Sequence, residues 1–388
     1  MRRRNVLDVL AAARPADLGG PASPPIAARP SGERRSRWIG VVAASLATAV
    51  VIGGVALPRL IGGEVSTGRL LGGSVAGPLD EVAERAAAQP DASGRYWHAA
   101  GSVLGEKVIG PARHPYRIKT RVGTSRWVPR DPARSLVLAQ RGLPSVPASP
   151  ADEETWRRAG APGLCGDDTD CGNDTAPLGR TRYLFMPAGW PFHEEGLTLE
   201  VDELLELPQE PGALKERLLS FLPAYSRGMA EWPAPPAGAS LPGKDSWLLG
   251  LSLDLLQYGP VRPATRAALY RMVADLPGTR ALGRVRDGEG RWGLAVGWTR
   301  PLADGQVEQR LVVDEADGDL LSVQNVVAKA WTYGPPGTTG LAGLPAGTVY
   351  QELVHDKPGW TDVPPPLPAS CPARPVAGDQ CGDAVRPR

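Results

Sequence analysis

The sequence lacks an excess of charge of either sign. Its 388 residues carry 43 Lys and Arg against 42 Asp and Glu, a formal net charge of +1. A whole-chain nucleic-acid binder needs a clear basic excess and an acidic tail protein the reverse, so both classes are excluded. We therefore expect no nucleic-acid partner.

Motifs for catalysis and for cofactors are missing as well. The chain has no G-x-S-x-G elbow and no P-loop. The G-x-G-x-x-G spacing at residues 288–293 falls at a turn between two expected strands and not before a helix, so it is not a dinucleotide-binding fingerprint. The HEE triplet at residues 193–195 lacks the second histidine of the H-E-x-x-H zinc motif, because position 197 is Leu. We predict a protein without catalytic activity and without a cofactor. A secreted-side hydrolase stays as the less favoured alternative, since the members of a serine triad are not neighbours in sequence.

The chain does contain one long apolar run, residues 38–57 (WIGVVAASLATAVVIGGVAL), with no charge over twenty positions. A helix of this length spans about 30 Å, the hydrocarbon thickness of a bilayer. Arg34, Arg35 and Arg37 precede it, so the positive-inside rule places the N-terminus in the cytoplasm and the rest outside the cell membrane. We predict an uncleaved, single-pass type II anchor. The alternative is a cleaved signal peptide, whose apolar region is usually about 7–15 residues long.

All four cysteines follow this run, at Cys165, Cys171, Cys371 and Cys381. An even number in an exported segment favours two disulfides, and the local pairs are Cys165–Cys171 and Cys371–Cys381, although three connectivities are possible. The spacings do not fit zinc.

The first cysteine pair encloses and adjoins a cluster of carboxylates, which are the oxygen ligands that calcium prefers. EF-hand spacing is absent, so we favour a solvated loop without metal. The candidate calcium ligands would be Asp167, Asp168, Asp170 and Asp174.

Composition divides the chain into five parts. These are a basic cytoplasmic arm (1–37), the membrane helix (38–57), a Gly-rich stalk (58–77), an extracytoplasmic α+β domain (78–362) and a Pro-rich tail (363–388). The tail has no apolar period, so we expect it to be disordered apart from its cysteine pair.

Within the domain, periodicity predicts a helix over 79–87, followed by strands, then helices, then strands. The strands are expected at 95–103, 116–122, 125–128, 135–140 and 181–186, and again at 281–286, 292–299, 307–313, 320–330 and 348–354. A loop is expected over 144–177, and further helices over 201–207, 211–222, 246–256 and 263–276. Segregated strands and helices predict an α+β fold with a mainly antiparallel, curved sheet, open like a half-barrel, and packed helices.

Aromatic side chains fall within these predicted strands and are candidates for lining a ligand cavity, because Trp and Tyr combine an apolar body with a polar tip. They are Tyr96, Trp97, Trp127, Tyr183, Phe185, Trp292 and Trp298. Packing in the core is the alternative interpretation.

Five segments of the domain carry a resemblance to known proteins. They are LDEVAERAAAQPDASGRYWHAAG (79–101), LPQEPGALKERLLSFL (207–222), VRPATRAALYRMVADLPGTRALG (261–283), QRLVVDEADGDLLSVQNVV (309–327) and LPAGTVYQELVHDKPGWTD (344–362). In these segments the chain resembles a family of actinobacterial single-span membrane proteins without an assigned activity, some of which accompany sigma factors. The phrase VVDEADGDLLSVQNV also resembles the strand–turn–strand unit of LolA-like carriers and of periplasmic sigma-E regulators, which form half-barrels closed by helices. These resemblances imply a binding or sensing domain that holds a lipid or hydrophobic peptide. The alternative they imply is an anti-sigma-like regulator that acts through the cytoplasmic arm on a sigma factor or another partner.

Overall fold

The computed structural model describes residues 76–164, 179–186, 190–191, 198–231, 243–302, 305–331 and 342–382. The predicted arm, membrane helix and stalk lie outside these residues, apart from the end of the stalk at 76–77. Arg34, Arg35 and Arg37 also lie outside them. Within the described ranges, no helix has the length and apolar character that crossing a membrane requires.

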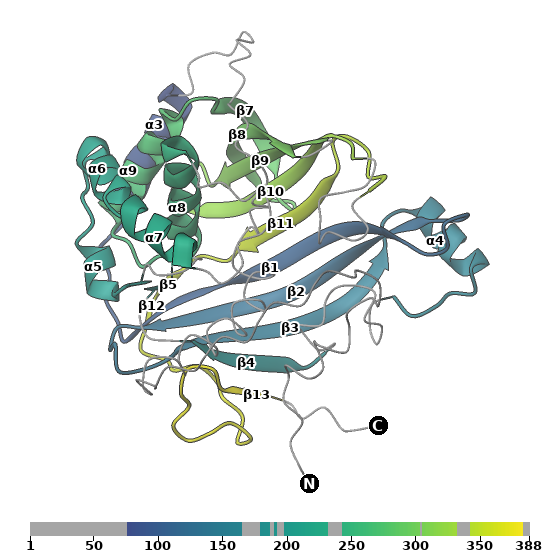
Figure 1. Ribbon diagram of the computed structural model, residues 1–388, viewed down its shortest axis with the longest axis horizontal. Helices are drawn as coiled ribbons and strands as arrows, with labels where there is room; N and C mark the ends of the chain where they lie inside the picture. The colour runs from purple at the N-terminus through teal and green to yellow at the C-terminus, as the bar shows by residue number, and fades with distance from the viewer. Residues whose placement is uncertain are drawn as a thin grey trace, which may run out of the picture. The chain divides into compact units, whose positions relative to one another are not determined.

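One antiparallel sheet of eleven strands dominates the described fold (Figure 1). The strands of its first half are β1 (Tyr96–Ile109), β2 (Tyr116–Pro129), β3 (Leu136–Pro147) and β4 (Thr181–Met186). Those of its second half are β7 (Arg280–Arg286), β8 (Trp292–Leu302), β9 (Gly305–Val313), β10 (Leu320–Lys329) and β11 (Val349–His355). The two short strands are β12 (Gly359–Thr361) and β13 (Gln380–Gly382).

The strand order is β13-β4-β3-β2-β1-β11-β10-β9-β8-β7, with β12 paired to β1. The two halves of the chain therefore meet where β1 pairs with β11, and the sheet does not close into a barrel. A separate small sheet joins β5 (Trp190–Pro191) to β6 (Thr198–Leu199). The predicted α+β class and the mainly antiparallel sheet are confirmed.

Helices cover part of one sheet face, and Figure 1 shows them grouped at one end of the long strands, with α4 at the other end. They are α3 (Ala76–Ala87), α4 (Pro150–Arg158), α5 (Val201–Leu205), α6 (Pro211–Leu219), α7 (Leu222–Glu231), α8 (Lys244–Tyr258) and α9 (Pro263–Ala274). The helix α8 is apolar nearly all round, and its Leu248 and Leu255 are completely buried.

Three local predictions differ from the structure. The two strands expected at 116–122 and 125–128 form one strand, β2, because Gly123 stays in register between Ser102 and Arg141. The loop expected over 144–177 begins with the end of β3 and contains α4, which starts at the N-cap Ser149. The helix expected over 211–222 is divided into α6 and α7.

The main core lies between the sheet and the helices. Alternate strand residues point to opposite sheet faces, and those that meet the helices form one continuous apolar cluster. We call this side the helix-covered face; its members include Trp97, Leu138, Val296, Leu311 and Leu353.

The β9–β10 turn contacts both α3 and α9 and so helps to hold these helices against the sheet. Gly318 has a φ of 75°, and a Cβ added there would lie 2.7 Å from the Ala86 Cβ of α3. The Tyr270 hydroxyl of α9 donates to the Gly318 carbonyl at 2.9 Å, and Arg266 pairs with the buried Asp319. The DEADGD sequence is thus a turn on which α3 and α9 both pack.

The Pro-rich tail departs from the expected disorder over residues 363–382, which we call the strap. Its β13 pairs with β4, and Cys371 forms a disulfide with Cys381, which confirms that predicted pair. The order follows from burial: Leu367 and both cysteines pack on aromatic side chains of the opposite sheet face. We call this side the strap-covered face.

Candidate functional site

A small cavity lies at the centre of the helix-covered face, where β1, β2, β3 and β11 meet α8. Its volume is about 10 Å³, enough for about one water molecule. Its lining includes the polar side chains of Arg126, Tyr258 and His355. The Arg126 guanidinium lies 4.3 Å from the ring centroid of Tyr258, and the His355 ring lies 5.8 Å from the same ring. A cation, a phenol and an imidazole are therefore gathered in a mostly apolar layer.

Burial controls the protonation of these groups. It lowers the pKa of the Arg126 guanidinium and raises the pKa of the Tyr258 hydroxyl. Burial also lowers the pKa of His355 to about 3, with a further contribution from the positive charges of Arg291 and Arg126. His355 is consequently a neutral imidazole at physiological pH, and its Nε2 has no hydrogen-bond partner.

The helix-covered face also carries N–H donors without acceptors. Trp97 and Trp298 each bury an indole Nε1, and Gln140 and Gln309 each bury an amide Nε2, yet none of these four atoms has a hydrogen-bond partner. The four side chains are at most 5% exposed. An indole nitrogen is always a donor. The N–H groups of Trp97 and Trp298 therefore lack an acceptor even if the oxygen and nitrogen of a glutamine amide are exchanged.

Two of these four groups, Trp298 and Gln309, belong to one row of polar side chains across the sheet. Trp298 of β8 is paired with Gln309 of β9, Gln309 with Asn325 of β10, and Asn325 with Gln351 of β11. Asn325 Nδ2 donates to Gln351 Oε1 at 2.8 Å, while Asn325 Oδ1 lacks a partner. With strands about 4.8 Å apart, the row is about 14 Å long. It lies beside the apolar row of Val296, Leu311, Val323 and Leu353.

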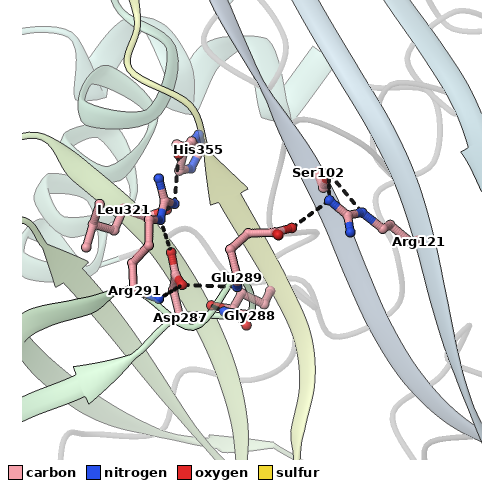
Figure 2. A network of polar contacts seen from close by, with 9 residues as sticks. Ser102, Arg121, Asp287, Gly288, Glu289, Arg291, Leu321 and His355 are labelled. Atoms are coloured by element: carbon pink, nitrogen blue, oxygen red, sulfur yellow. Dashed lines mark hydrogen bonds and ion pairs between the residues drawn. The ribbon is translucent and has the colours of Figure 1, made fainter.

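A second polar network surrounds the β7–β8 turn, and its groups are well paired (Figure 2). The Asp287 carboxylate accepts from the backbone N–H groups of Glu289 and Arg291 and from Arg291 Nε. Arg291 also donates to the carbonyls of Leu321 and His355, so this turn is tied to the ends of β10 and β11.

The same turn reaches the first half of the sheet. Glu289 pairs with Arg121 of β2 at 2.5 Å, and Arg121 donates to the Ser102 hydroxyl at 3.3 Å (Figure 2). Glu352 accepts from Gly288 N–H and from Gln324 Nε2, and burial raises the pKa of its carboxyl. Because the Asp287 carboxylate and the Arg291 guanidinium bond to several strand and turn groups, we interpret this network as a structural clamp.

The structure distributes the seven aromatic candidates over three places. Trp97 and Trp298 lie in the helix-covered core. Trp292 is 54% exposed and stacks against Arg286. The remaining four share a cluster beneath the strap: Tyr96, Trp127, Tyr183 and Phe185. They therefore do not line one cavity.

The other sequence candidates fall outside the described residues: Cys165, Cys171, Asp167, Asp168, Asp170, Asp174 and the HEE triplet. Within the described ranges, no three His, Cys, Asp or Glu side chains are placed to hold a metal ion. Sequence reasoning missed Arg126, Gln140, Gln309 and His355. The signal for them is a polar residue at an inward position of an alternating strand.

No protein-family model, no curated protein sequence and no solved structure matches this chain. The resemblance to the actinobacterial membrane family and to LolA-like carriers stays a prediction from the sequence segments. The proposed regulatory role of the arm also stays a prediction, because residues 1–37 are outside the described part of the chain.

Proposed function

We propose that this chain is a membrane-anchored, extracytoplasmic binding protein without catalytic activity. It holds an amphipathic molecule, a lipid or a hydrophobic peptide, between the sheet and the helices of the helix-covered face. The observation that carries the proposal is the set of buried N–H donors without acceptors at Trp97, Gln140, Trp298 and Gln309.

Such donors are costly in a protein that binds nothing. A buried polar group without a partner costs about 1–3 kcal/mol, and native proteins contain few of them. Here four lie on a single sheet face, and the unpartnered acceptors on this side include Asn325 Oδ1 of β10 and Gln257 Oε1 of α8. The excess of donors favours a ligand rich in acceptor oxygens, such as the esters and phosphate of a lipid or the carbonyls of a peptide.

The apolar surroundings suit the rest of such a ligand. The row of Val296, Leu311, Val323 and Leu353 adjoins the polar row, and the leucines of α8 lie in the same cluster. A cavity of about 10 Å³ holds no acyl chain, so the helices must move away from the sheet when the ligand enters. Contacts between the helices favour their movement as a unit: Trp247 Nε1 of α8 donates to the Leu218 carbonyl of α6 at 3.0 Å.

The test uses the full chain, purified from membranes in detergent, with the released small molecules measured by mass spectrometry. The variant Trp298→Phe/Gln309→Met removes two unpartnered donors. The control Trp292→Phe/Gln306→Met makes the same exchanges at exposed positions of the same two strands. We expect wild type and control to retain one molecule that the donor variant has lost. Absence of any molecule from wild type, or equal retention by the donor variant, would refute the proposal.

A further inference from the structure

The aromatic cluster beneath the strap is an ordered row on the strap-covered face. Trp127 of β2 is paired with Val137 of β3, and Val137 with Phe185 of β4. His98 of β1 continues the row and stacks on Trp127 at a centroid distance of 4.6 Å. Tyr183 lies one step along β4 on the same face, opposite Ala139. Three of these four neighbouring strands thus present aromatic rings, and Val137 and Ala139 of β3 fill the space between them with small apolar side chains.

A proline-rich segment of the same chain covers this surface. Residues 363–368 read VPPPLP, and Leu367 packs against the aromatic cluster. The Tyr183 hydroxyl donates to the Pro366 carbonyl at 2.8 Å. Proline-rich peptides are recognised elsewhere by this combination of aromatic faces for the rings and hydroxyl or indole donors for the carbonyls. Proline carbonyls are strong acceptors that have few partners within the peptide itself.

The segment is held as a bridge between two anchors. At its start, Arg95 Nη2 donates to the Asp362 carbonyl at 2.7 Å, and β12 pairs with β1. At its end, Phe185 N–H donates to the Asp379 carbonyl at 3.0 Å, next to the disulfide and β13. Between the anchors, the contacts of 363–368 are shallow, and Val363 is 68% exposed.

We propose that the aromatic row of β1–β4 is a recognition surface for proline-rich peptides, which the chain's own residues 363–368 occupy as a tethered competitor. The partner is a proline-rich segment of another protein, with an apolar residue among its prolines as in VPPPLP. This site lies on the face opposite the proposed lipid or peptide site and does not depend on it. Tethering gives the internal segment an effective concentration on the order of millimolar, so an external peptide binds weakly until the strap is displaced.

The test replaces the competitor and keeps the anchors. In the full chain, the five residues 364–368 (PPPLP) are changed to GSGSG, with both cysteines retained. A fluorescent VPPPLP peptide is titrated into this variant and into wild type, and a VGGGLG peptide is the control. We expect the variant to bind VPPPLP on the order of 10²-fold more tightly than wild type does, and to bind VGGGLG no better than wild type does.

Two further variants distinguish recognition from loose association. We call the chain with GSGSG at residues 364–368 the strap variant. Adding Trp127→Ala to it should abolish the gain in peptide affinity. Adding Trp292→Ala should leave that gain intact, because Trp292 lies outside the aromatic cluster. A folded strap variant that binds VPPPLP no better than wild type would overturn the proposal.

If the strap variant does not fold, Leu367→Gly provides the same comparison with a smaller change. The proposal predicts that this variant also binds VPPPLP more tightly than wild type does. Unchanged affinity in a folded Leu367→Gly chain would overturn it equally.

Discussion

The two faces of the β1–β4 half of the sheet are covered in different ways. On the helix-covered face, helices from the middle of the chain make a deep apolar contact that encloses polar atoms without partners. On the strap-covered face, a short tail makes a shallow contact that is anchored by a disulfide and by paired backbone groups. The first cover is maintained by burial and the second by covalent and backbone constraints, so they should fail under different perturbations.

The largest expected difference is in the cost of removing a leucine from each cover. Leu248 of α8 is completely buried, so Leu248→Ala should lower the free energy of unfolding by about 2–5 kcal/mol. Leu367 of the strap is partly exposed, and Leu367→Ala should cost about 1 kcal/mol or less. Denaturant unfolding of both variants measures this. Equal losses would mean that the strap is part of the main core.

The disulfide should matter for one cover only. Cross-linking a loop of this length stabilises by about 2–3 kcal/mol, so the Cys371→Ser/Cys381→Ser variant should lose about that much in strap docking. Hydrogen exchange of the Gly378 and Phe185 amides, which bond across the strap and β4, should then accelerate. Amides of α8 should stay as protected as in wild type. Faster exchange throughout α8 would contradict the separation of the two covers.

Acid should weaken the helix-covered face. The pKa of His355 is about 3 in the folded chain and about 6.5 when the chain is unfolded. Between pH 6.5 and pH 3 the His355 imidazole is protonated in the unfolded chain but neutral in the folded chain. The folded state is therefore at its most stable, with respect to this group, above pH 6.5, and it loses stability as the pH falls toward 3. The slope is at most about 1.4 kcal/mol per pH unit. Melting curves of wild type and His355→Gln should diverge below pH 6.5, with the shallower pH dependence in the variant. Parallel curves would show that His355 is accessible to protons in the folded state.

The sequence predicts where the helices and strands lie better than it predicts which of them pair or pack together. The strand expected at 181–186 coincides with the observed β4, and the apolar run in α8 predicts a buried helix. The helix α4 was missed although Ser149, Pro150 and Asp152 form a typical helix start, because the Gly and Pro residues around it favour a loop.

The candidate sites are harder to predict because they depend on strand pairing. Trp298, Gln309 and Asn325 are far from any shared sequence motif and become a row only when β8, β9 and β10 align. The sequence also predicts disorder for the strap, which is ordered. A Pro-rich composition does not reveal the aromatic surface on which the strap packs.

The most direct test of the central claim compares two buried glutamines on neighbouring strands. Gln309 Nε2 has no partner, whereas Gln324 Nε2 donates to the Arg286 carbonyl at 2.9 Å and to Glu352 at 3.0 Å. Both side chains are at most 2% exposed.

The measurement is the free energy of unfolding of Gln309→Met and of Gln324→Met, each without added ligand. Because methionine preserves the length of the side chain and removes its polar atoms, Gln324→Met should lose about 1–3 kcal/mol and Gln309→Met should be neutral or slightly more stable than wild type. That result would show that the Gln309 donor is kept for something other than the protein's own stability. If Gln309→Met loses as much as Gln324→Met, the donor is used within the protein, and the proposed ligand site is wrong.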